Sequence, residues 1–402
     1  MSSRSETVAV CEIPGGTVTG QLSLSGDDVY ILRDPLVVGE DRFDNPSGAT
    51  GQLDIDAGAV ILATRDARIV VNADSSMRAE GLPSDPIVFT AFSDIDDITG
   101  ESQADIRAAI NDGNAEAGAF TQLGQWGSVV LLGRAPTEFC DGDPTDNCIV
   151  AFNFQTFPAG GNDANDGENI LRNTRFQFGG EASLPSLWLG ALGRGNLIEN
   201  VQVHGSGGGG IYVTGGTVNA RQLASTLNPD TFRHALTLAF GYQGEIDRFV
   251  GATAGASSDG INITAADAGS GATLFTEPVL ANATIISQDD LVTGDLPSSA
   301  PLVSDGNTGG RLVNSLLLGF SDDPVFIGTS RLDIAATAIF RRDQLPGAAE
   351  PTFFTRAPSE PAPVSVGGAF AVTRDHVGAF DASVTNYSDS WLSPWALEVA
   401  FD

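Results

Sequence analysis

Leu171-Arg-Asn-Thr-Arg-Phe-Gln-Phe178 is the first clear copy of a repeated motif in which an apolar residue and an Asn precede a run of β-forming apolar residues. Further copies are Ile198-Glu-Asn-Val-Gln-Val203, Leu280-Ala-Asn-Ala-Thr-Ile-Ile286 and Leu312-Val-Asn-Ser-Leu-Leu317. Most copies are followed by a Gly-rich turn and a second short apolar run, such as Leu187–Leu189. Successive copies, looser ones included, start roughly 20 to 34 residues apart, which fits one solenoid coil of two or three strands with turns.

The repeat predicts an all-β fold, a right-handed parallel β-helix in which each strand pairs with its equivalents in the coils before and after. Alternate side chains then point into a narrow interior, which suits the Val, Ile, Leu and Phe of the motif. An Asn at a fixed place in successive coils can bond to the next Asn at a tight turn. We therefore expect a structural ladder, rather than a ligand site, of Asn173, Asn200, Asn282 and Asn314.

The rest of the chain follows the same design with two interruptions. The solenoid is predicted to span residues 15–345, after an N-terminal lead of residues 1–14. Residues 96–119, which are compatible with a helix around Ile106–Ile110, and residues 136–168 are interpreted as loop excursions. A Pro-rich linker, 346–363, then precedes a C-terminal cap or segment, 364–402.

The composition limits the possible partners. The chain carries 51 acidic residues against 20 basic ones, all of them Arg, and its formal net charge is −31. A field of this sign repels nucleic-acid phosphates and anionic membranes, whereas it attracts cations such as Ca²⁺. No apolar run of transmembrane length occurs. Nucleic acid is therefore not an expected partner, and polysaccharides or other cell-surface components are the partners left open.

Two of the three cysteines, Cys140 and Cys148, flank a polar loop that a disulfide closes easily, while Cys11 lies far from them in the sequence. No CxxC pair occurs, so a zinc site is unsupported. The N-terminus lacks the apolar core of a signal peptide, so the protein is either cytosolic or secreted after removal of such a peptide. A disulfide needs an oxidising compartment, and we therefore expect a secreted or cell-surface protein.

Two acidic runs have the alternating spacing of oxygen ligands that can wrap a Ca²⁺ ion. The first run is Asp141, Asp143 and Asp146, between the cysteines, and the second is Asp163, Asp166 and Glu168. Neither run matches the EF-hand loop. Calcium is therefore the one cofactor that the sequence suggests, and solvated turns are the alternative.

Nine segments are typical of one group of proteins: Leu53–Val60, Ala79–Gly81, Asp85–Thr90, Gly124–Pro136, Phe176–Gly180, Gly215–Ala220, Phe240–Gly244, Val377–Phe380 and Trp391–Trp395. Together they resemble a bacterial family of secreted and cell-surface β-helix proteins, often described as hypothetical surface proteins or lipoproteins, of the pectate-lyase-like superfamily. The resemblance implies a right-handed parallel β-helix and export, but no particular reaction. Many members carry Asp-rich runs where this chain has His204–Gly210 and Asn228–His234, so it has largely lost any Ca²⁺ site that those runs form.

The chain lacks the motifs of most enzymes built on this scaffold. Polygalacturonase-like hydrolases carry Gly-His-Gly and Arg-x-Lys elements and some lyases use a Lys base, but this chain has no Lys and no Gly-His-Gly. A Ca²⁺-dependent polysaccharide lyase with an Arg base remains an alternative, with candidates Arg194, Arg221, Arg233 and Arg248.

A glycan-binding module is the second alternative. Trp188, Tyr212 and Phe240 lie in or beside successive strands, where they form either an outward stripe for sugar stacking or part of the core. We assign no catalytic residue. The leading prediction is a non-catalytic extracellular protein with a structural, adhesion or matrix role.

Overall fold

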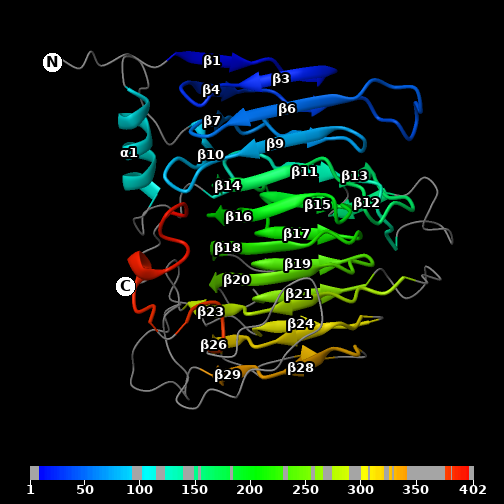
Figure 1. Ribbon diagram of the computed structural model, residues 1–402, viewed down its shortest axis with the longest axis vertical. Coiled ribbons are helices and arrows are strands. Elements are labelled where there is room, and N and C mark those ends of the chain that lie inside the picture. Colours follow the sequence, from blue (N-terminus) through cyan, green and yellow to red (C-terminus); the bar gives the residue numbers. More distant parts are fainter. Residues whose placement is uncertain are drawn as a thin grey trace.

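A computed structural model shows short strands stacked in the successive coils of a parallel β-helix (Figure 1). Of the described strands, only β12 (Ile149–Phe152) and β13 (Gln155–Pro158) pair with each other antiparallel. The predicted fold class is confirmed. The structure describes residues 9–92, 102–114, 123–138, 149–152, 155–181, 184–229, 234–254, 259–265, 274–288, 300–306, 308–320, 326–327, 330–341, 376–381 and 383–397.

The strands form three faces along the solenoid, here called the polar face, the covered face and the third face. Ten of them make the third face: β2 (Gly16–Val18), β5 (Leu36–Val38), β8 (Ile69–Val71), β11 (Val129–Leu132), β15 (Leu187–Gly190), β17 (Ile211–Thr214), β19 (Leu236–Ala239), β21 (Ile261–Thr264), β24 (Leu302–Ser304) and β27 (Phe326–Ile327). Four long strands bend and serve both other faces: β14 (Ile170–Gln177), β16 (Leu197–His204), β18 (Ala220–Pro229) and β20 (Glu245–Ala254).

The first halves of these long strands continue the polar face, whose other members are β3 (Gly20–Leu24), β6 (Gly51–Asp56), β9 (Ser76–Glu80), β22 (Val279–Ala281), β25 (Arg311–Val313) and β28 (Asp333–Ala335). The second halves continue the covered face. Its other members are β1 (Val10–Ile13), β4 (Val29–Leu32), β7 (Val60–Ala63), β10 (Ile87–Ala91), β23 (Thr284–Gln288), β26 (Leu316–Phe320) and β29 (Ala338–Arg341).

The interior is a continuous column of apolar side chains, because alternate residues of each strand point inward. Leu171 and Phe176 of β14 are buried in this column together with Ile198 and Val203 of β16. Phe89 of β10 stacks on Phe176 in the next coil, with 5.0 Å between the ring centroids. Equivalent residues of the motif therefore contact one another from coil to coil.

Two segments cover the outward apolar side chains of the covered face, and both lie on the same side of the solenoid (Figure 1). Helix α1 (Gln103–Asn114) packs Ile106 and Ile110 against β4, β7 and β10. Arg107 anchors it through an ion pair with Asp85, 3.0 Å long. The C-terminal segment, residues 376–381 and 383–397 with the short 3₁₀ helix η4 (Tyr387–Asp389), packs against the later strands β18, β20, β23 and β26.

The two predicted excursions differ in structure. The described part of the first contains α1, at the place where the sequence is compatible with a helix, and the second contains the β12–β13 hairpin. Among the described residues, the first strand paired between coils is β1, from Val10, which lies within the predicted N-terminal lead. The predicted linker 346–363 lies outside the described residues. In the described part of the chain no helix is long and apolar enough to cross a membrane.

The four Asn residues of the motif all lie at the bend between the polar and covered faces, in the left-handed conformation (φ 47° to 55°) that Asn tolerates better than most residues. Asn200 Nδ2 donates to Asn173 Oδ1 over 2.9 Å, and Asn314 Nδ2 donates to Asn282 Oδ1 over 2.7 Å. Gln222 and Arg248 occupy the same bend in the coils between these pairs. The structure thus has two separate Asn pairs, and Asn200 Oδ1, although buried, has no hydrogen-bond partner among the described residues.

We predict that Gln222→Asn stabilises the protein by about 1 kcal/mol, because an Asn there can donate to Asn200 Oδ1 and suits the left-handed bend (φ 56°). Urea unfolding of the variant and of the parent protein measures the gain. The control is Gln222→Gly, which relieves the backbone without adding the donor. A gain no larger than that of the Gly variant would contradict the role of the hydrogen bond.

Candidate functional site

Turns that lead from the third face to the polar face lie along one edge of the solenoid. Four segments of this edge are here called the turn edge: residues 39–50, 72–75, 160–169 and 191–196. Asn169 joins these turns to the strands. Its Oδ1 accepts a hydrogen bond from the Met77 amide, and its Nδ2 donates to Asn196 Oδ1, each over 2.9 Å. The segment 160–169, which carries the predicted acids Asp163, Asp166 and Glu168, is therefore held against the starts of β9 and β14.

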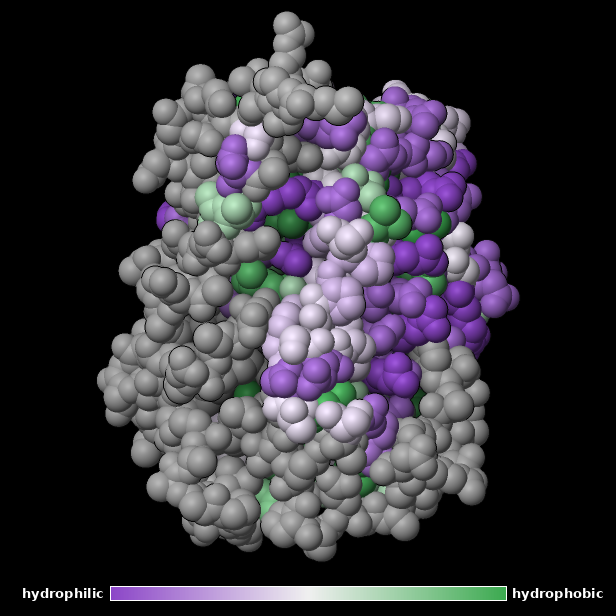
Figure 2. Space-filling view, turned by 60° about the vertical axis from the view of Figure 1, so that its left-hand side comes forward, coloured by the Kyte–Doolittle hydropathy of each residue, from purple (hydrophilic) through white to green (hydrophobic). Residues whose placement is uncertain are grey.

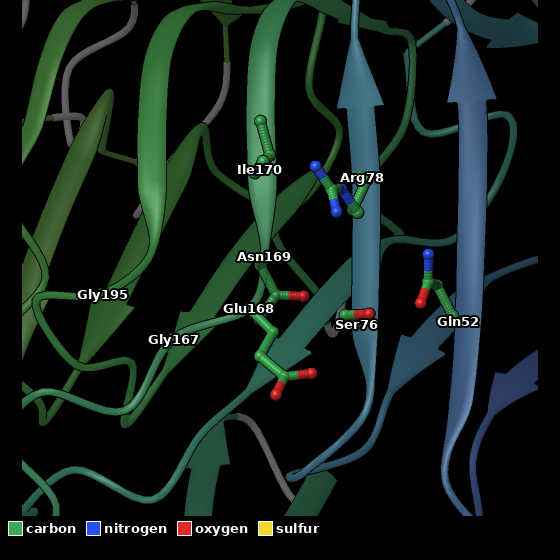
Figure 3. Close-up of a pocket in the computed structure, with 8 residues that line it drawn as sticks. All are labelled: Gln52, Ser76, Arg78, Gly167, Glu168, Asn169, Ile170 and Gly195. Carbon is green, nitrogen blue, oxygen red and sulfur yellow. The ribbon is translucent and has the colours of Figure 1, made fainter.

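A pocket of about 270 Å³ opens where the turn edge meets the polar face (Figure 3). Arg78, whose guanidinium lies 3.2 Å from Glu80, brings a cation to the pocket, and Glu168 brings an anion. Gln52 Nε2 is held by Asp54, 2.8 Å and 2.9 Å from the two carboxylate oxygens. The complete lining is Gln52, Ser76, Arg78, Gly167, Glu168, Asn169, Ile170 and Gly195. Such a pocket offers donors and acceptors to a small polar group.

The predicted acids of the turn edge have separate roles. Asp163 accepts from the Asn165 amide over 3.0 Å, Asp166 accepts from the Arg134 amide over 3.1 Å, and Glu168 lines the pocket. No group of three or more His, Cys, Asp or Glu residues that could hold a metal ion occurs in the described part of the chain.

The other predicted site residues, Asp141, Asp143, Asp146, Cys140 and Cys148, lie outside the described residues. Calcium binding and a disulfide there stay predictions. Cys11, on β1, is half-buried and has a free thiol.

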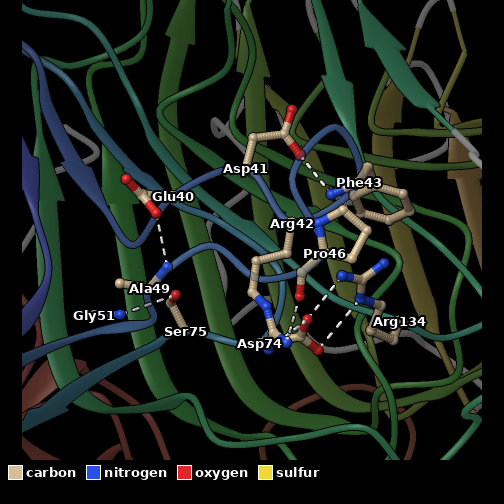
Figure 4. A network of polar contacts seen from close by, with 10 residues as sticks. All are labelled: Glu40, Asp41, Arg42, Phe43, Pro46, Ala49, Gly51, Asp74, Ser75 and Arg134. Atoms are coloured by element: carbon tan, nitrogen blue, oxygen red, sulfur yellow. Dashed lines mark hydrogen bonds and ion pairs between the residues drawn. The ribbon is translucent and has the colours of Figure 1, made fainter.

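At the turn edge, Asp74 binds two arginines from different coils (Figure 4). Arg134 binds it through two hydrogen bonds, Nη2 to Oδ2 over 2.7 Å and Nε to Oδ1 over 3.2 Å. Arg42 lies 3.3 Å from the same carboxylate. The Arg134 guanidinium also stacks over the Phe43 ring, 3.9 Å from its centroid. These contacts fasten the 39–50 turn to the coil that carries β11, so they hold the turn edge together.

Asp166 is the acid of this edge with the clearest electrostatic signature. Burial, the largest effect, raises its pKa from 3.8 to about 6, and the negative charges of Asp163 and Asp74 act in the same direction. The hydrogen bond from the Arg134 amide and the Arg134 charge oppose this rise. The pKa of Asp166 therefore lies well above the usual range of an aspartate.

The outward side chains of the polar face form a column of alternating charge. Arg172 lies 3.8 Å from Glu80 in the coil before it and 3.6 Å from Glu199 in the coil after it. Arg221 follows, 2.7 Å from Glu199. Figure 2 shows hydrophilic residues gathered in a band down one side of the molecule. Stacking at equivalent positions brings these charges together, and their opposite signs make the contact favourable.

The aromatic residues considered as candidates for sugar stacking, Trp188, Tyr212 and Phe240, point outward from the third face but are not exposed. Trp188 and Tyr212 contact each other edge to face, with 5.8 Å between centroids, and Phe157 of β13 contacts Trp188 at 5.4 Å. Trp188 is fully buried, and Phe240 is a half-buried member of the same cluster. The β12–β13 hairpin therefore packs over these aromatic residues. They form neither an exposed stripe for sugar stacking nor part of the interior column.

Two of the arginines considered as lyase bases, Arg221 and Arg248, lie near the same carboxylate, Asp247, and their charges lower its pKa against the larger effect of burial. Arg221 belongs to the charge column, and Arg248 lies at the bend between the polar and covered faces. The Arg194 amide donates to Ala164 O at the turn edge, and Arg233 lies outside the described residues.

Sequence reasoning missed most of the pocket and of the Asp74 network. Gln52, Ser76 and Arg78 belong to weakly repeated N-terminal coils, and nothing local links them to Glu168. The sequence contains a signal for Asn169 and Asn196, because each lies four residues before an Asn of the repeated motif, Asn173 and Asn200. That spacing marks a second paired position at the start of the strand.

We predict that Asp166→Asn stabilises the protein at pH 8, on the order of 1 kcal/mol after allowance for solvent screening, and has little effect near pH 4. The raised pKa means that the folded state holds the proton more tightly than the unfolded chain. The stability that this proton contributes is fully present below about pH 3.8 and is lost as the pH rises through about 6. Asn resembles the protonated acid at every pH.

Urea unfolding at both pH values measures the difference between the variant and the parent protein. The control is Asp163→Asn, which removes an exposed charge from the same segment. Equal gains for the two variants at pH 8 would contradict the burial argument.

A family model described as the pectate-lyase-like β-helix domain matches residues 115–320, which is 206 of the 402 residues. No curated protein and no solved structure shows a significant match. The matched region includes the coils from β11 to β26, the hairpin and the turn segment 160–169. Because the match covers more than half of the chain, the chain belongs to the pectate-lyase-like β-helix domain family.

Proposed function

We propose that this protein is a non-catalytic, secreted or cell-surface β-helix protein with a structural, adhesion or matrix role. The observation that carries the proposal is the charge column of the polar face. Glu80, Arg172, Glu199 and Arg221 are engaged with one another across four coils. A general acid or base must instead face a bound substrate with a pKa matched to its task.

The other faces support the same role. The apolar outer side of the covered face is packed beneath α1 and the C-terminal segment, and the aromatic stripe of the third face is packed beneath the β12–β13 hairpin. The strongly negative net charge also disfavours a polyanionic substrate such as a polyuronate. A rigid rod with a charged surface suits a protein that spaces or supports other components.

We predict that the protein releases no unsaturated or reducing sugar ends from a panel of acidic and neutral polysaccharides, with or without millimolar Ca²⁺. Absorbance of unsaturated uronates and a reducing-end assay measure product, with an active pectate lyase as the positive control. Product formed in proportion to protein and time would contradict the proposal and favour the Ca²⁺-dependent lyase.

The pocket supports a second candidate function, a module that binds glycan without cleaving it. Its lining combines an amide, a hydroxyl, a guanidinium and a carboxylate, which are the groups that bind sugar hydroxyls. In this case the rod carries its own attachment site at the turn edge.

For this second function we predict that Arg78→Met weakens retention on the bound polysaccharide at least tenfold, because it removes the cationic donor of the pocket. Affinity electrophoresis in gels that contain each polysaccharide measures retention. Arg172→Met is the matched control, because Arg172 approaches the same Glu80 but does not line the pocket. Equal loss in both variants would show a general charge effect and count against the pocket.

A further inference from the structure

The C-terminal segment packs on the outer side of the covered face of the solenoid. Its apolar residues, among them Phe380, Leu392 and Trp395, pack on a strip of small and aliphatic side chains that projects from the covered face. This strip, here called the acceptor strip, consists of Ala224, Val250, Ala252, Ile286, Leu316 and Leu318. No strand pairing joins the described part of the segment to the solenoid.

Two buried side chains of the solenoid bind the main chain of the segment. Arg175 of β14 donates from Nε to Trp395 O over 2.5 Å and from Nη2 to Ala396 O over 3.1 Å. Gln202 of β16 accepts from the Leu397 amide over 2.7 Å and donates to Leu397 O over 3.3 Å. Burial lowers the pKa of Arg175 to about 10, so the guanidinium is still charged at neutral pH and its hydrogen bonds are charge-assisted.

Aromatic stacking inside the segment sets its shape. The rings of Phe380, Trp391 and Trp395 stack in a row, with centroid separations of 5.8 Å and 6.1 Å. Trp395 is almost fully buried, and its indole nitrogen donates to Trp391 O over 2.9 Å. The segment is thus a compact unit whose aromatic rings stack on one another. Its apolar residues pack against the acceptor strip.

The tether between the solenoid and this unit is long. Residues 342–375, which number 34, separate the last described residue of β29 from the segment. A chain of that length spans at most about 120 Å when fully extended. Because none of the contacts above depends on the tether, a segment from another copy can make every one of them.

We propose that the acceptor strip, with Arg175 and Gln202, is a binding site for the C-terminal segment of a second copy of this chain. Copies then join by exchanging the segment. In dilute solution the tether keeps each chain's own segment at a high effective concentration, so the monomer prevails. At the local concentrations of a surface layer, exchange links one rod to the next. This inference goes beyond the proposed function, and its test can fail while the absence of catalysis stands.

The test pairs two full-length variants, each with half of the contact removed. The segment-deficient variant carries Trp391→Ser and Trp395→Ser, and the acceptor-deficient variant carries Arg175→Met and Gln202→Leu. Each is expected to be monomeric alone. Mixed at equal micromolar concentrations, they should form a one-to-one complex in which the empty acceptor strip of the first binds the displaced segment of the second. Light scattering after size exclusion, with a different tag on each chain, measures mass and composition.

The matched control replaces the acceptor-deficient variant by Arg172→Met, which alters an exposed Arg of the same strand and leaves the segment bound in its own chain. Mixed with the segment-deficient variant, it should give at least tenfold less complex. Far-UV circular dichroism checks strand content, and Trp395→Leu alone replaces the double Trp variant if that one unfolds. Folded variants that stay monomeric when mixed, or equal complex formation with the control, would overturn the proposal.

Discussion

The structure depends above all on the hydrogen bonds between coils. Each strand of a parallel β-helix satisfies its main-chain groups with the coil before and the coil after, at a strand spacing of about 4.8 Å. This pairing places equivalent residues directly above one another, as in the register of β14 with β16 from Ile170 with Leu197 to Gln177 with His204. A residue type that suits a position once therefore has to suit contact with its own kind, or with a complement, in the next coil.

Each column of side chains meets this requirement through a different kind of contact. Phe89 and Phe176 stack inside the solenoid, and Asn amides pair at the bend, where one residue in each coil from β14 to β28 has a positive φ. Charged residues outside alternate in sign, as Arg172 does between Glu80 and Glu199. Where the outward column is apolar, stacking alone leaves it in water, so α1 and the C-terminal segment cover it. The hydrophobic effect thus accounts for both additions to the plain solenoid.

The contacts made by the outward side chains bear on function. The outward charges of the column from Glu80 to Arg221 are engaged in ion pairs, and the apolar outward columns are packed beneath covering segments, whereas the pocket at the turn edge is a place where polar groups face solvent. At the turn edge the chain also departs from the repeat, because the insertion before β14 brings Glu168 to residues from earlier coils. Loops on a regular scaffold are the usual carriers of binding. A supporting rod with one attachment point on its turns agrees with both observations.

The parallel β-helix could be predicted from the sequence alone, because the Asn-containing motif repeats with apolar residues at alternating positions and pairing between coils permits only a narrow set of residues there. It also indicated the helix around Ile106, through local composition. The alignment of particular coils in register becomes visible only in the three-dimensional fold. The same holds for the pocket of Gln52, Arg78 and Glu168, the Asp74–Arg134 pair and the contact of Arg175 with Trp395. These groups lie tens to hundreds of residues apart. Their meeting depends on the number and length of the intervening coils, which no local pattern records.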